Sequence, residues 1–179
     1  MSRGGLRVLL VFADALIAVQ CAGVAWDFWH IVAGRIPIGN LLFPDLLWHT
    51  TSPWVREWDR LEVAMIAGTF VSGGILAPLL IRFLSRRTGR SLPRFLMSSA
   101  VAGMVYAWMV VTLTSGIVGV VYIPASSIPP PLSFGLFLIG GAAAITPVFA
   151  PLVVLVGSVV GMLNGVLVRR AWGQDRLLL

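Results

Sequence analysis

Four long apolar segments, separated by shorter polar stretches, dominate the chain. They lie at about 7–25, 61–84, 95–121 and 132–168. An α-helix needs roughly 20 apolar residues to cross a bilayer, and each segment meets or approaches that length. Because lipid offers no partners for backbone hydrogen bonds, such segments form helices. The pattern predicts an all-α polytopic membrane helical bundle of about four transmembrane helices, forming a single domain over 1–179.

The last apolar segment, 132–168, is too long for one straight crossing and too short for two crossings with a turn. Pro147 and Pro151 lie in its middle, and a proline inside a helix removes a hydrogen bond and kinks the axis. We therefore expect one long helix, kinked or split at 147–151. A short re-entrant half-helix followed by a full span is the alternative.

Composition supports a membrane location. Hydrophobic residues make up 58% of the chain and charged residues 11%, whereas soluble domains carry about 25% charged residues. The single cysteine, Cys21, excludes an internal disulfide and any cysteine-based metal cluster. The net charge of +6 comes from arginines placed between apolar segments. Because they form no basic stripe, we expect no nucleic-acid partner.

The arginines also predict how the chain is oriented. In a four-span arrangement ten of the thirteen lie on one side of the membrane, and the positive-inside rule makes that side cytoplasmic. We therefore expect a multi-pass protein of the cell inner or plasma membrane with both termini in the cytoplasm. The ten are Arg3, Arg7, Arg82, Arg86, Arg87, Arg90, Arg94, Arg169, Arg170 and Arg176.

The segment 26–60 forms the predicted outer loop and holds the chemistry-bearing residues. It contains both histidines of the chain and five of its seven tryptophans. Asp27 and His30 are three residues apart, and Asp45 and His49 are four apart. On helical backbone either spacing places both side chains on one face. Imidazole and carboxylate ligands suit copper, zinc or iron, so these four residues are the candidate metal ligands.

A second interpretation of this loop involves no metal. Tryptophans at the end of a membrane span usually form an interfacial belt, and Asp–His pairs also occur as ordinary hydrogen bonds. No hydrolase, P-loop or dinucleotide motif is present. The sequence therefore leaves the catalytic residues unknown and indicates no organic cofactor.

A family resemblance adds to the metal hypothesis. The run Trp-Asp-Phe-Trp-His at 26–30, then Gly34-Arg35, then Phe43-Pro44-Asp45-Leu46-Leu47-Trp48, resembles the outer-face motif of the C subunit of membrane-bound copper monooxygenases, which oxidise methane or ammonia. The resemblance implies copper, with Asp27 and His30 matching the first two ligands. The family spaces that pair four apart and has a histidine near the position of Asp45. His49, one helical turn later, would substitute.

Two features inside the spans complete the prediction. Asp14 interrupts the first segment, and an intramembrane carboxylate is a functional candidate by default. It would carry a proton or bind a partner's arginine, or else lie near the interface and reach toward Arg7. Gln20 and Asn164 are expected to donate hydrogen bonds between helices.

Gly157, Gly161 and Gly165 recur every four residues and form a tandem GxxxG face. Such faces let two helix backbones approach closely, either within one chain or between subunits. We expect contact with lipid and, through these glycines, with other membrane subunits. The functional hypotheses are a subunit of a copper-dependent monooxygenase- or oxidase-like complex, a non-catalytic accessory subunit, and a small proton-coupled transporter.

Overall fold

The computed structural model describes residues 3–32, 60–122, 127–140, 142–143 and 146–173. It shows five helices and no strand in these ranges: α1 (Arg3–Val32), α3 (Arg60–Ser85), α4 (Leu92–Tyr122), α5 (Pro130–Gly140) and α6 (Thr146–Gly173). Four of them are long and apolar enough to cross a membrane, namely over Gly4–Cys21, Val63–Ser85, Leu92–Val121 and Val153–Trp172. The prediction of an all-α membrane bundle is confirmed.

The last apolar segment does not form a single helix. It divides into α5, which ends at Gly140, and α6, which begins at Thr146. The helix expected over 132–168 is therefore split, but between Gly140 and Thr146 and not at 147–151. The order of a short helix followed by a full span is that of the alternative. Pro147 occupies the first turn of α6, where the missing N–H has no partner to lose, so it starts a helix instead of kinking one.

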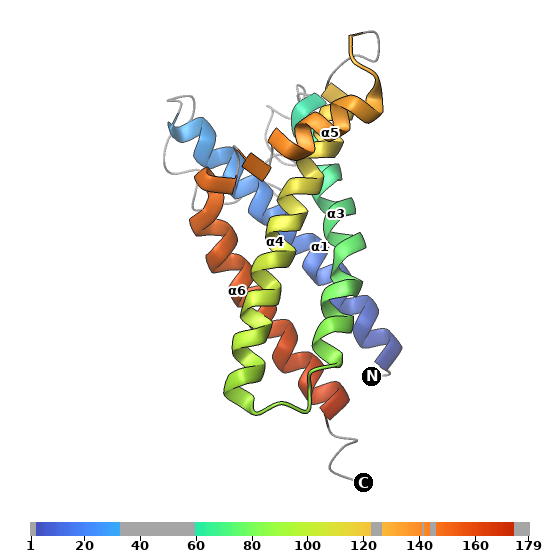
Figure 1. Cartoon of the computed structure of the whole chain (residues 1–179), viewed down its shortest axis with the longest axis vertical. Helices are drawn as coiled ribbons and strands as arrows, with labels where there is room; N and C mark the ends of the chain where they lie inside the picture. Colours follow the sequence, from blue (N-terminus) through green and yellow to red (C-terminus); the bar gives the residue numbers. More distant parts are fainter. Residues whose placement is uncertain (1–2, 33–59, 123–126, 141, 144–145, 174–179) are drawn as a thin grey trace, which may run out of the picture.

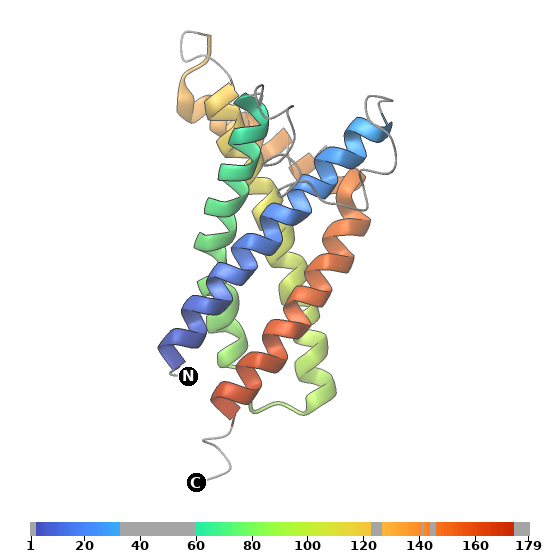
Figure 2. The same ribbon diagram turned by 180° about the vertical axis from the view of Figure 1, so that it is seen from behind.

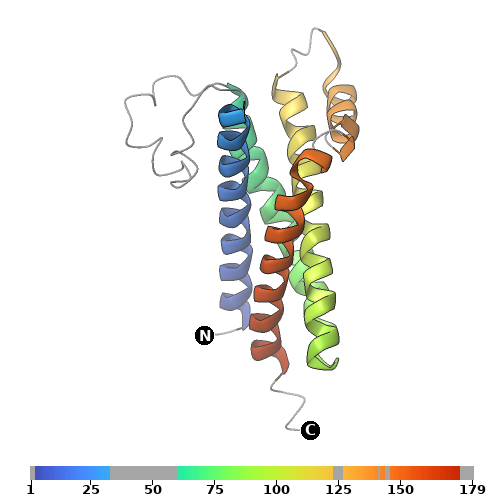
Figure 3. The same ribbon diagram turned by 90° about the vertical axis from the view of Figure 1, so that its left-hand side faces the viewer.

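Aromatic packing explains why α5 lies beside α4 (Figures 1 and 3). Gly116 and Gly119 of α4 lie against the rings of Phe134 and Phe137. A Cβ at Gly116 would stand 2.7 Å from the Phe134 ring, and one at Gly119 would stand 2.5 Å from Phe137. The two rings therefore occupy space that only glycine leaves open.

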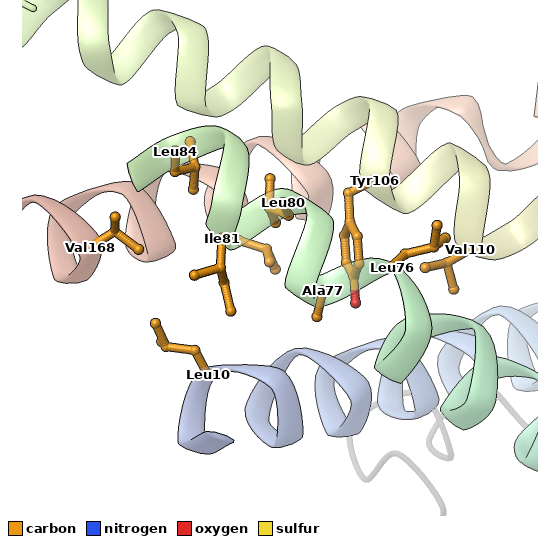
Figure 4. Close-up of a cluster of buried hydrophobic side chains, with 10 residues drawn as sticks. Leu10, Leu76, Ala77, Leu80, Ile81, Leu84, Tyr106, Val110 and Val168 are labelled. Atoms are coloured by element: carbon orange, nitrogen blue, oxygen red, sulfur yellow. The ribbon is translucent and has the colours of Figure 1, made fainter. Parts of the chain in front are cut away.

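The core joins all four long helices. Figure 4 shows side chains of α1, α3, α4 and α6 meeting in one cluster. Its buried members are Leu10, Leu76, Ala77, Leu80, Ile81, Leu84, Tyr106, Val110, Val160 and Val168. Figure 2 shows α1 running obliquely over the bundle, where it packs mainly on α3 and more lightly on α6.

The three glycines of the GxxxG face pack within the chain. All three are buried, and they lie on Ser99, Gly103 and their neighbours in α4. A Cβ at Gly161 would meet the Ser99 carbonyl oxygen and stand 2.8 Å from the Cα of Gly103. We call this contact the glycine seam. The expectation that Gly157, Gly161 and Gly165 bind another subunit is corrected, because α4 already covers them.

The start of α1, the link between α3 and α4, and the end of α6 lie at the same end of the bundle (Figure 1). We call it the basic end, because Arg7, Arg82–Arg94 and Arg169–Arg170 gather there. Rings lie beneath several of these arginines. The Arg7 guanidinium carbon is 5.3 Å from the ring centroid of Trp172, and that of Arg169 is 5.4 Å from Phe95. These contacts tie α6 to α1 and to α4.

Candidate functional site

A buried polar pair joins α1 to α6 in the interior of the bundle. Asp14 is 2% exposed and Asn164 is 3% exposed. The Nδ2 atom of Asn164 donates to Oδ1 of Asp14 at 2.7 Å and to Oδ2 at 2.8 Å. Both residues lie near the middle of their apolar spans. The carboxylate is therefore held by an amide deep in the bundle, and the alternative in which it reaches toward Arg7 does not form.

This contact was only half predicted from the sequence. The sequence predicts Asn164 as an interhelical donor, and the structure confirms this. It also marks Asp14 as a costly group in lipid, but nothing in the sequence joins the two residues. They stand 150 positions apart, so only the folded bundle brings them together. The pair satisfies both polar groups where water is excluded, which is the usual way a bundle tolerates an intramembrane acid.

Three other polar side chains of the interior are also hydrogen-bonded, whereas the buried Nη1 of Arg169 has no hydrogen-bond partner. The Tyr106 hydroxyl donates to the carbonyl of Gly73 at 3.3 Å, and the Thr114 hydroxyl donates to the Ser72 hydroxyl at 3.5 Å. The Ser99 hydroxyl donates to the Phe95 carbonyl of its own helix at 2.8 Å. The first two bonds connect α4 to α3, and the third stays within α4. They support a packing role for the interior.

The candidate metal ligands fall in two groups. Asp27 and His30 lie on α1, which stays helical as far as Val32; the structure describes their backbone and not their side chains. At about 1.5 Å per residue they lie roughly 9 and 14 Å beyond Cys21, where the apolar span ends. Asp45 and His49 lie outside the described residues. Their convergence with Asp27 and His30 stays a prediction.

The part of the chain that the structure describes contains no group of three or more His, Cys, Asp or Glu side chains able to hold a metal ion. The further ligands that the copper hypothesis names beside Asp27 and His30, Asp45 and His49, lie outside this part of the chain. Asp27 and His30 fit copper by the chemistry of their donors, a carboxylate oxygen and an imidazole nitrogen. Their register on α1, about 4.5 Å apart along the axis, is compatible with one shared ion.

Comparison with protein families, with curated proteins and with solved structures found no match to this chain. Its function is therefore inferred from its residues and from the geometry of the bundle.

Proposed function

We propose that the chain is an integral membrane subunit of a copper-dependent monooxygenase- or oxidase-like complex. Its metal site would be held by Asp27, His30 and His49 at the end opposite the basic end, with Asp45 as a fourth ligand or as the group that orients an imidazole. One observation supports this most. The helix α1 continues past its apolar span through the Trp-Asp-Phe-Trp-His run, so Asp27 and His30 lie three residues apart on helical backbone beyond that span.

The chain's own residues would supply ligands and orientation. Imidazole nitrogens bind copper in its common oxidation states, and a carboxylate that accepts a hydrogen bond from the second ring nitrogen fixes the tautomer. Copper bound there would activate oxygen or pass electrons. A rigid helix positions ligands more tightly than a loop does, which is the contribution of α1 to such a site.

The metal content of purified protein tests this proposal. Full-length chain, isolated from copper-supplemented cells through a tag without histidines, should retain near-stoichiometric copper. His30→Ala should lose most of it, because one imidazole ligand is gone. Gln20→Ala, on the same helix and inside the apolar span, is the matched control and should keep its metal. Equal copper in wild type and His30→Ala would end the proposal.

We also propose that the basic end lies in the cytoplasm and that the host membrane is the inner or plasma membrane. The support is that the segments carrying most of the arginines, the start of α1, the α3–α4 link and the end of α6, lie at one end of the bundle (Figure 1). Positively charged residues are retained on the cytoplasmic side. Both ends of the chain would then be cytoplasmic. The candidate ligands would face outward.

A second candidate is an accessory membrane subunit without a cofactor. The described bundle favours it in one respect: the interior is built from contacts between helices, namely the Asp14–Asn164 pair, the core and the glycine seam. A His30→Ala chain that still co-purified with its partner subunits, and left the oxidising activity of their complex unchanged, would favour this candidate. The transport hypothesis rests on Asp14, whose carboxylate accepts two hydrogen-bond contacts from Asn164 and so has a packing role in this bundle.

A further inference from the structure

A groove of about 580 Å³ lies between α3 and α4 on the half of the bundle nearer the basic end. Its floor is formed by buried residues of the core, Leu76, Leu80 and Tyr106. These side chains belong to the core cluster that also contains residues of α1 and α6 (Figure 4). The groove is therefore a fixed feature of the packed bundle and opens on its lipid-facing side.

The walls of the groove are apolar. Met97, Val101, Val105 and Met109 recur every four residues and line its α4 side, while Leu79 and Phe83 line its α3 side. All six are exposed, Met97 by 74%. From Arg94 to Met109 the α4 wall extends for about 22 Å. That length is enough to accompany an acyl chain through one leaflet, about half of the roughly 30 Å hydrocarbon core.

Three arginines line the same groove at its basic end: Arg87, Arg90 and Arg94. Arg87 and Arg90 lie in the link between the spans of α3 and α4, and Arg94 lies in the first turn of α4, so all three sit at headgroup depth. The Arg87 guanidinium carbon is 3.9 Å from the ring centroid of Phe83, which fixes it over the wall. Within the described residues, no acidic side chain pairs with any of the three.

We propose that this groove binds an anionic phospholipid. The headgroup phosphate would be bound by Arg87, Arg90 and Arg94, and one acyl chain would lie along the Met97–Met109 stripe. The three positive charges favour a headgroup of net negative charge over a zwitterionic one. Each guanidinium group can also bind two oxygens of the phosphate at once. The long apolar wall selects a lipid over a free phosphate ion. The site is independent of the metal proposal, since it lies at the opposite end of the bundle.

Lipid retention in native mass spectrometry tests the site. The full chain in mild detergent is offered equal amounts of phosphatidylglycerol and phosphatidylcholine with identical acyl chains. Wild type should retain phosphatidylglycerol with a preference of about tenfold or more. The triple variant Arg87→Gln, Arg90→Gln, Arg94→Gln should fall to near parity. Val101→Trp, which fills the groove and leaves the arginines intact, should lower retention of both lipids.

The matched control removes the same charge from the same end outside the groove. Arg82→Gln, Arg86→Gln and Arg170→Gln are exposed positions that do not line it, and this triple variant should keep most of the preference. Equal losses in the two triple variants would show only diffuse attraction to a basic surface and would overturn the proposal. Unchanged retention by Val101→Trp would likewise remove the groove as the place where the acyl chain binds.

Discussion

Replacing Gly161 by alanine is expected to lower the free energy of unfolding by about 1–3 kcal/mol, the usual range for overpacking a filled contact. The added methyl would overlap the Ser99 carbonyl oxygen and stand 2.9 Å from the Gly103 nitrogen. Both are backbone atoms, so they cannot turn aside and the two helices must separate. For a chain of this size the midpoint of thermal unfolding in detergent should fall by roughly 3–10 °C.

Gly74→Ala is the matched control for this experiment. Gly74 also lies within a membrane helix, but a Cβ there would have nothing within 4 Å. Because alanine favours helix over glycine, that variant should be as stable as wild type or slightly more so. Gly103→Ala approaches the seam from α4 and should be destabilised like Gly161→Ala. If Gly161→Ala proved as stable as Gly74→Ala, the result would contradict the close packing of α6 on α4 at the glycine seam.

Loss of the amide of Asn164 should leave a carboxyl group in the bundle without its donor. We expect Asn164→Leu to cost about 1–2 kcal/mol, since a buried polar group that loses its partner bears its desolvation cost unrelieved. The double variant Asp14→Leu with Asn164→Leu removes both polar groups. It should be more stable than Asn164→Leu alone. Chemical unfolding in mild detergent gives the four free energies of this double-mutant cycle.

The coupling within the cycle is the informative quantity. Direct bonding from Asn164 Nδ2 to both oxygens of Asp14 predicts that the two single costs do not add. Asp14→Asn keeps the size of the side chain and one acceptor oxygen for the Asn164 amide, so it should lose less stability than Asp14→Leu. Strictly additive costs would mean that the two residues act separately.

The membrane spans were predictable because lipid imposes a simple rule on the sequence. Segments of about 20 apolar residues must be helical, and the expected segments 61–84 and 95–121 fall inside α3 and α4 with ends within three residues of the observed ones. The arginines were equally informative. The arginines of the 82–94 stretch lie in and beside the link between α3 and α4. This link is at the same end of the bundle as the start of α1 and the end of α6.

Contacts between helices were much less predictable. The small-residue spacing of Gly157, Gly161 and Gly165 marks a close-packing face but does not say which helix covers it. Ser99 and Gly103 show the same spacing, and only the structure pairs the two faces. The position of α5 was unpredictable for a similar reason. The rings of Phe134 and Phe137 pack on Gly116 and Gly119 of another helix, and the sequence does not indicate that contact.

The metal hypothesis depends on His30 and His49 lying at one site, and electron paramagnetic resonance of the Cu(II)-loaded full chain tests this most directly. With ¹⁵N-labelled histidine, the spectrum should show nitrogen coupling from two imidazoles, and His30→Ala and His49→Ala should each remove one of them. A spectrum without imidazole coupling, or one that neither substitution changes, would contradict a copper site built from these two histidines.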